Sequence, residues 1–137
     1  MVLIGAFNND WSLRLMGQQR FSFERDGDTF WIRDQQHPSD KSLTVNYATP
    51  YLGLTEDYAL ISRVLDPVTE RMVVLAGGLT GYGTEAAGEF LTQPRYMETM
   101  AEAAPRNWER KNVQIVISTR VINGKSGPPR LLKVHFW

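Results

Sequence analysis

The sequence predicts a single α/β domain, built as a sandwich around a mixed and partly parallel sheet. Two continuous apolar runs, Val2–Phe7 and Met72–Gly77, have the composition of strands that are covered on both faces. Helical patterns follow both runs, and shorter aromatic-rich or alternating stretches indicate hairpins. We therefore expect a Rossmann-like core that contains the two apolar strands, with antiparallel hairpins at the edges of the sheet.

The size and charge of the chain favour a globular domain and argue against binding to nucleic acid or a membrane. The chain has 137 residues, of which 42% are hydrophobic and 22% charged, as in an ordinary globular domain. Its 15 basic residues balance its 15 acidic residues, so we expect no direct contact with nucleic acid. No apolar run approaches the roughly 20 residues of a membrane span, so we expect no membrane contact by this segment. The absence of cysteine excludes disulfides and thiolate chemistry; the compartment stays open, with the cytoplasm favoured.

The first half of the chain predicts small elements. Asn8–Asp10 offers capping residues for a short helix that ends near Met16. Two aromatic-rich stretches flank an Asp-Gly-Asp turn within Arg20–Asp34, which is a hairpin signal. Gln35–Glu56 contains two X-Pro pairs and is predicted to be a long loop with one short strand near Leu43–Val45. A loop of this length in a compact domain is either functional or a sign of a missed element.

The second half predicts the main sheet. Asp57–Asp66 alternates as a strand does, and a turn leads from it into the apolar run Met72–Gly77. A helix is predicted from about Thr84, and a second helical piece fits within Pro94–Pro105, with one apolar stripe. A C-terminal hairpin is predicted from two further runs, Asn112–Gly124 and Arg130–Trp137.

A glycine-rich joint between strand and helix is the first candidate binding feature. Its glycines allow backbone angles and close approaches that a side chain forbids; they are Gly77, Gly78, Gly81 and Gly83. A helix that begins near Thr84 would point free N–H groups and a positive dipole end into this loop, which suits an anion. The glycine spacing matches neither the dinucleotide-binding fingerprint nor the P-loop. The alternative is a tight turn whose only anion is Glu85.

The two loops that follow the apolar strands should meet if those strands are parallel neighbours, because ligands bind beyond the carboxyl ends of strands in open α/β sheets. Asn8 and Asn9 would then hydrogen-bond a small polar or anionic metabolite, and Trp11 or Tyr82 would stack on it. The alternatives are helix capping for the asparagines and core packing for Trp11. The predicted ligand-binding residues are Asn8, Asn9, Trp11, Gly78, Thr80, Tyr82, Gly83, Thr84 and Glu85.

The sequence contains no motif for metal binding, for a P-loop or for a serine hydrolase. His37 and His135 lack metal-ligand spacing, and we expect neither a metal nor a cofactor. Gly124-Lys125-Ser126 resembles part of a P-loop, but Thr119 stands where the first glycine is required, so a hairpin turn is favoured. No G-x-S-x-G elbow is present to anchor a hydrolase triad.

Four strings carry a resemblance over nearly the whole chain: LIGAFNNDWSLRL, DYALISRVLDPVTERMVVLAGGL, GTEAAGEFL and NVQIVISTRVINGKSGPPRLLKVHFW. They resemble the C-terminal domain of uncharacterised, mainly acidobacterial multi-domain proteins. These look like regulators in which a winged-helix or other signalling region precedes this domain. The resemblance implies that residues 1–137 are a domain from the C-terminal end of a longer protein. It carries over no catalytic residue.

We therefore expect a non-enzymatic module of a bacterial regulatory protein, which senses a small ligand or mediates oligomerisation. Two alternatives stay open. One is an enzyme that acts on a nucleotide or nucleoside with Glu85 as acid or base. The other is a purely structural interaction domain, in which the terminal hairpin with Phe136 and Trp137 pairs across a homodimer.

Overall fold

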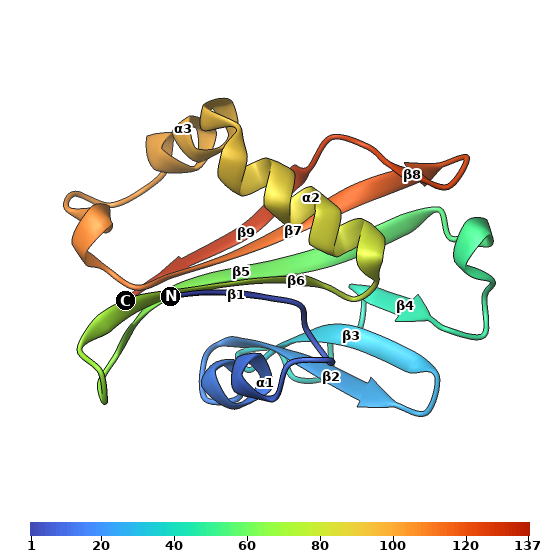
Figure 1. Cartoon of the computed structure of the whole chain (residues 1–137), viewed down its shortest axis with the longest axis horizontal. Helices are drawn as coiled ribbons and strands as arrows, with labels where there is room; N and C mark the ends of the chain where they lie inside the picture. The colour runs from blue at the N-terminus through green and yellow to red at the C-terminus, as the bar shows by residue number, and fades with distance from the viewer.

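A six-stranded mixed sheet lies at the centre of the structure, a computed structural model that describes residues 1–137 (Figure 1). Its strand order is β1-β6-β5-β7, and both β8 and β9 pair with β7. Only β1 and β6 run parallel; every other pair is antiparallel. The strands are β1 (Val2–Ile4), β5 (Glu56–Asp66), β6 (Arg71–Gly78), β7 (Val113–Ile122), β8 (Lys125–Ser126) and β9 (Arg130–Phe136).

A layer covers each face of this sheet (Figure 1). The helices α2 (Gly81–Thr92) and α3 (Pro94–Glu102) lie on one face. On the other face lie α1 (Asp10–Met16) and a separate antiparallel sheet in the order β2-β3-β4. These strands are β2 (Phe21–Asp26), β3 (Thr29–Asp34) and β4 (Thr44–Asn46), and two 3-10 turns, η1 (Tyr51–Gly53) and η2 (Trp108–Arg110), complete the chain.

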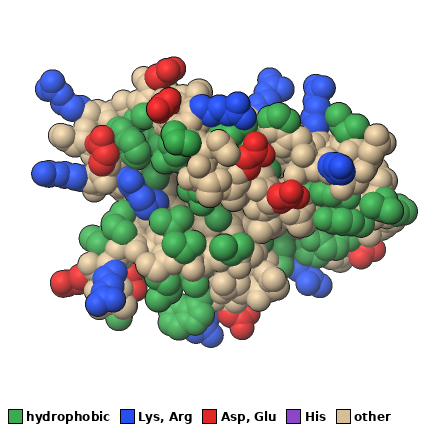
Figure 2. Space-filling view, turned by 45° about the horizontal axis from the view of Figure 1, so that its top comes forward, with side chains coloured by type: hydrophobic (Ala, Val, Ile, Leu, Met, Phe, Trp, Pro, Cys, Tyr) green, Lys and Arg blue, Asp and Glu red, His purple; other side chains and the backbone are tan.

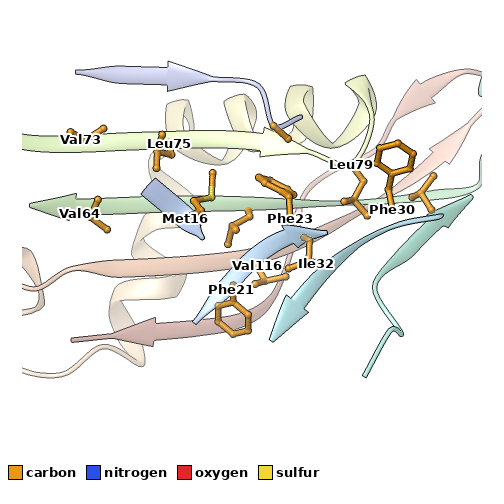
Figure 3. Close-up of a cluster of buried hydrophobic side chains, with 13 residues drawn as sticks. Met16, Phe21, Phe23, Phe30, Ile32, Val64, Val73, Leu75, Leu79 and Val116 are labelled. Atoms are coloured by element: carbon orange, nitrogen blue, oxygen red, sulfur yellow. The ribbon is translucent and has the colours of Figure 1, made fainter. Parts of the chain in front are cut away.

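The large sheet separates two apolar cores, because successive side chains of a strand point to opposite faces. Along β5, Leu60 and Val64 belong to the core beneath the small sheet, whereas Ala59 and Ile61 belong to the core beneath the helices. Figure 3 shows the first core, in which side chains from α1, β2 and β3 meet those of the large sheet. Most of β5 and β7 is therefore buried on both faces, including polar positions such as Ser62 and Gln114.

Buried polar side chains attach the small sheet to the large one. The Gln114 amide of β7 accepts a hydrogen bond from Phe21 N at 2.9 Å and donates one to Phe21 O at 2.9 Å. The same amide nitrogen donates to Ser62 Oγ at 3.0 Å. The amide therefore occupies the place that a neighbouring strand would take beside β2.

The α/β class with a mixed sheet is confirmed, and three details of the prediction are corrected. The two apolar strands pair in parallel as predicted, but antiparallel pairing extends through the middle of the sheet and is not confined to hairpins at its edges. The first apolar run is not covered on both faces: β1 is an edge strand, and Val2 and Ile4 are 63% and 68% exposed. The strand ends at Ile4 because Gly5 turns the chain with a φ of +110°.

The third correction concerns α2, which begins at Gly81 rather than near Thr84 because the Thr80 side chain caps it by accepting from Tyr82 N. The hairpin of β2 and β3, the short helix α1 and the C-terminal strands lie where the sequence predicted them. The predicted hairpin turn is present, but the turn itself is Asn123-Gly124, and Lys125 and Ser126 form β8, which pairs with the end of β7. None of the helices combines the length and apolar character that a membrane crossing requires.

Candidate functional site

A cleft of about 570 Å³ opens where β1 and β6 end. The two strands pair in parallel, with Leu3 opposite Leu75, so the loops that follow them leave the sheet at the same end. The first loop contributes the segment Ile4–Asn8 to the cleft, and the second contributes Gly78–Gly81. The polar side chains that line the cleft are those of Asn8, Tyr47, Thr80, Thr84 and Glu85.

The N-terminus of α2 lies beside this cleft. The buried carboxylate of Asp57 binds the backbone N–H groups at this helix N-terminus. Asp57 Oδ2 accepts hydrogen bonds from Gly83 N at 2.6 Å, from Thr80 N at 3.0 Å and from Thr80 Oγ1 at 2.6 Å. Its other oxygen accepts from Tyr58 N at 2.7 Å. Burial raises the pKa of this carboxyl above its usual value, and the hydrogen bonds from Thr80, Tyr58 and Gly83 oppose that rise.

This arrangement corrects the prediction of free N–H groups near Thr84. Thr84 N donates to Thr80 O at 3.2 Å, and the N–H of Gly83 is taken by Asp57. The resident anion is therefore Asp57, which comes from a neighbouring strand, and not Glu85, which lies beyond the first turn of α2. A carboxylate at this position already balances the positive end of the helix dipole.

The glycines of the joint serve close packing. A Cβ on Gly78 would lie 2.4 Å from the backbone of Gly83, and a Cβ on Gly83 would lie 2.6 Å from Tyr58 O. The β6–α2 corner is thus folded tightly against β5, and this contact explains why side chains are missing there.

The structure brings together only some of the predicted ligand-binding residues. Asn8, Gly78, Thr80, Thr84 and Glu85 line the cleft. The remaining four, Asn9, Trp11, Tyr82 and Gly83, are not part of its lining.

Each residue outside the cleft has another role. Asn9 caps α1 by accepting hydrogen bonds from Trp11 N at 3.1 Å and Ser12 N at 3.3 Å. Trp11 is 66% exposed and lines a different groove, so it neither packs in the core nor reaches the cleft. Tyr82 is buried, stacks on Tyr51 with ring centroids 4.1 Å apart and donates its hydroxyl to Tyr51 O at 3.1 Å.

Two tyrosines of the long loop complete the site, and the sequence analysis missed both. Tyr47 stacks on Phe30 with centroids 3.8 Å apart, donates its hydroxyl to Leu79 O and lines the cleft. Tyr51 joins Tyr47 in lining an adjoining pocket of about 270 Å³. The loop over residues 35–56 therefore supplies a wall of the site. Its unusual length was the only signal in the sequence.

The cleft is acidic. Glu85 is the only charged residue that lines it, and the lining contains no lysine or arginine. The second carboxylate, on Asp57, lies just behind Thr80. A phosphate or carboxylate ligand would thus meet repulsion without a countering cation, whereas hydrogen-bond donors would find oxygen acceptors.

No group of three or more histidine, cysteine or acidic side chains is arranged to hold a metal ion. Comparison of the chain with protein-family models, curated proteins and solved structures found no match. The resemblance to the acidobacterial proteins accordingly stays a prediction, and the chemistry of the cleft follows from its geometry.

Proposed function

We propose that residues 1–137 form a ligand-binding module whose cleft takes a small polar molecule carrying an amine or another hydrogen-bond donor. The observation that carries this proposal is the convergence of Asn8, Thr80, Thr84 and Glu85 in one cleft at the carboxyl ends of β1 and β6. Ligands of open α/β sheets occupy this position, and in this one respect the site is Rossmann-like.

The size of the cleft fits such a ligand. Small-molecule sites have volumes of about 300–1,000 Å³. The cleft measures about 570 Å³, and the tyrosine pocket beside it adds about 270 Å³. Phe7 and Tyr47 give it aromatic surface, while Asn8 offers both donors and acceptors.

Binding without turnover is the function that these side chains support best. Acid–base catalysis at Glu85 would have only Tyr47 as a second titratable side chain in the cleft lining, and the Tyr47 hydroxyl already donates to Leu79 O. Both oxygens of Asp57 are engaged by donors of the chain itself. Within a multi-domain regulator, occupancy of the cleft would be the signal, which is the role of a sensor.

The test is a thermal-shift screen with primary amines, amino acids and nucleosides, followed by calorimetric titration of the hits. Inorganic phosphate serves as the anionic comparison. A ligand at a hundredfold excess over its dissociation constant stabilises the fold by about 2.7 kcal/mol. We expect hits among amine-bearing compounds and none for phosphate.

Two charge-neutralising variants provide matched controls. Glu85→Gln in the cleft should weaken binding of an amine, whereas Glu98→Gln on the exposed surface of α3 should leave it unchanged. A screen without hits contradicts the proposal, as does a hit whose affinity both variants leave unaltered. Product formation that Glu85→Gln abolishes would favour the enzyme instead.

A further inference from the structure

A second groove, of about 350 Å³, lies at the end of the large sheet where the β5–β6 hairpin and both termini are found (Figure 1). It is lined by α1, by this hairpin and by the last residue of the chain. Four large apolar side chains line it and are well exposed: Trp11 at 66%, Leu65 at 52%, Val68 at 88% and Trp137 at 43%. Exposed apolar side chains that gather at one place mark an interaction surface, and tryptophan is enriched in such surfaces.

Backbone hydrogen bonds hold the wall of this groove in place. Asn112 and Trp137 exchange two of them, at 2.9 and 3.1 Å. The Asn112 side chain accepts a further bond from Leu65 N at 2.8 Å, which ties β5 to the end of the chain. The Trp137 ring stacks on His135 with centroids 5.3 Å apart. The groove is thus preorganised, which reduces the entropy lost when it binds a partner.

The charges around the groove indicate what covers it. Arg14 and Asp66 are the only charged side chains in its lining, one of each sign. Arg14 forms no ion pair within the chain. A two-fold axis places each residue of such a surface against a different residue of an identical surface, so Arg14 of each copy can face Asp66 of the other.

Val68 lies in the turn between β5 and β6, lines the groove and is 88% exposed, so its side chain is available for contact with a second copy. We propose that a second copy of this chain docks here, forming an isologous dimer through Trp11, Leu65, Val68 and Trp137.

Pairing of the terminal hairpin across a dimer fits the structure less well. The outer edge of β9 is open, but β9 carries Arg130 and Lys133, and antiparallel pairing of this strand with itself would bring like charges together. Figure 2 shows basic and acidic side chains interspersed on the face turned to the viewer, with no large field of one sign that would suit a strongly charged partner.

Sedimentation equilibrium from micromolar to millimolar protein tests the proposal. We expect the mass to rise from the 15.6 kDa of one chain toward twice that value. Val68→Glu should raise the dimer dissociation constant about tenfold or more. The matched control is Leu52→Glu, at an apolar side chain that is 78% exposed outside the groove, and it should leave the constant unchanged.

Charge reversal tests the orientation of the two copies. Arg14→Glu should weaken the dimer. Adding Asp66→Asn to the same chain removes the repulsion between like charges and keeps an oxygen that accepts from Val68 N, so it should recover part of the affinity, with circular dichroism to verify folding. A chain that stays monomeric overturns the proposal, as does a dimer that Val68→Glu leaves intact or that Leu52→Glu weakens equally. Failure of the folded double variant to recover affinity overturns the two-fold arrangement. The ligand screen is independent of each of these results.

Discussion

Asp57 shows at the scale of one residue how a buried carboxylate shapes the molecule. Replacing it by alanine leaves the N–H groups of Thr80 and Gly83 without their acceptor, and each unsatisfied buried group costs about 1–3 kcal/mol. We expect Asp57→Ala to lower the free energy of unfolding by roughly 3 kcal/mol, and Asp57→Asn, which keeps one acceptor oxygen, by about 1 kcal/mol. Urea denaturation measures both. Equal losses would show that the carboxylate does not act as an acceptor at the helix.

Asp34 gives the fold a dependence on pH. Its carboxylate accepts from Arg20 Nε at 3.0 Å and Arg20 Nη2 at 3.1 Å, and its side chain is nearly buried. Burial raises its pKa, but the hydrogen bonds from Arg20, Gln36 N and His37 outweigh this and hold the pKa far below 3.8. The ionised Asp34 carboxylate therefore stabilises the folded chain fully at pH values above 3.8, the pKa of this group in the unfolded chain. This contribution to the free energy of unfolding is lost as the pH falls toward the lower pKa that Asp34 has in the folded chain.

The corresponding variant is Asp34→Asn, which should lose about 2 kcal/mol at neutral pH, in the range of hydrogen bonds to charged groups. The difference in the free energy of unfolding between this variant and the parent chain should shrink as the pH falls below 3.8, the pKa of Asp34 in the unfolded chain. Urea titrations at neutral and acidic pH measure it. A difference that does not change with pH would assign the loss to packing.

At the scale of elements, two glycines near α2 predict opposite effects of the same substitution. A Cβ on Gly78 would collide with the backbone of Gly83, so Gly78→Ala must displace α2 from β6 and should destabilise the fold by about 3 kcal/mol, as overpacking at a rigid site does. A Cβ on Gly88, within α2, meets nothing within 4 Å. Gly88→Ala should stabilise by about 0.5–1 kcal/mol. Thermal unfolding of the pair measures both, and a tolerated Gly78→Ala would show that the corner is not tightly packed.

Elements are also the scale at which the sequence was most informative. Alternation of apolar and polar residues predicted β5 and β7 as strands, although both present side chains to two cores and their polar residues Ser62 and Gln114 are buried as well. It failed for β1, since an apolar run cannot distinguish a buried strand from an edge strand whose residues Val2 and Ile4 stay exposed. The start of α2 was misplaced because Thr80 and Thr84 are both suitable caps, and Asp57, distant in sequence, makes Thr80 the better one.

At the scale of the whole molecule, the sheet order predicts a gradient of stability. β5 and β7 are paired on both sides and covered on both faces, whereas β1 and β8 are short and peripheral. Amides of β5 and β7 should exchange with solvent only through global unfolding, and those of β1 and β8 through local opening. Hydrogen exchange followed by NMR measures this. Equal protection of β1 and β5 would contradict the assigned order.

The candidate site could be predicted only in part because it assembles at this largest scale. The sequence predicted that Asn8 and Thr84 lie close together on one assumption, that β1 and β6 pair in parallel. The structure confirms this pairing, and both residues line the cleft. Tyr47 and Tyr51 come from a loop without periodicity, so no pattern pointed to their position. Glu85 was among the predicted residues, but the buried carboxylate of Asp57 was missed because it reaches α2 from a strand that is distant in sequence.

The amide of Gln114 has a consequence beyond joining the two sheets. Phe21 opens β2, which lies at the margin of the small sheet, and unpaired groups at such margins invite other chains to add on and begin fibrils. Gln114 engages both backbone groups of Phe21 from inside the molecule. A single interior side chain thereby closes the first position of this open edge, and the charged residues Glu24, Arg25 and Asp26 follow further along the strand.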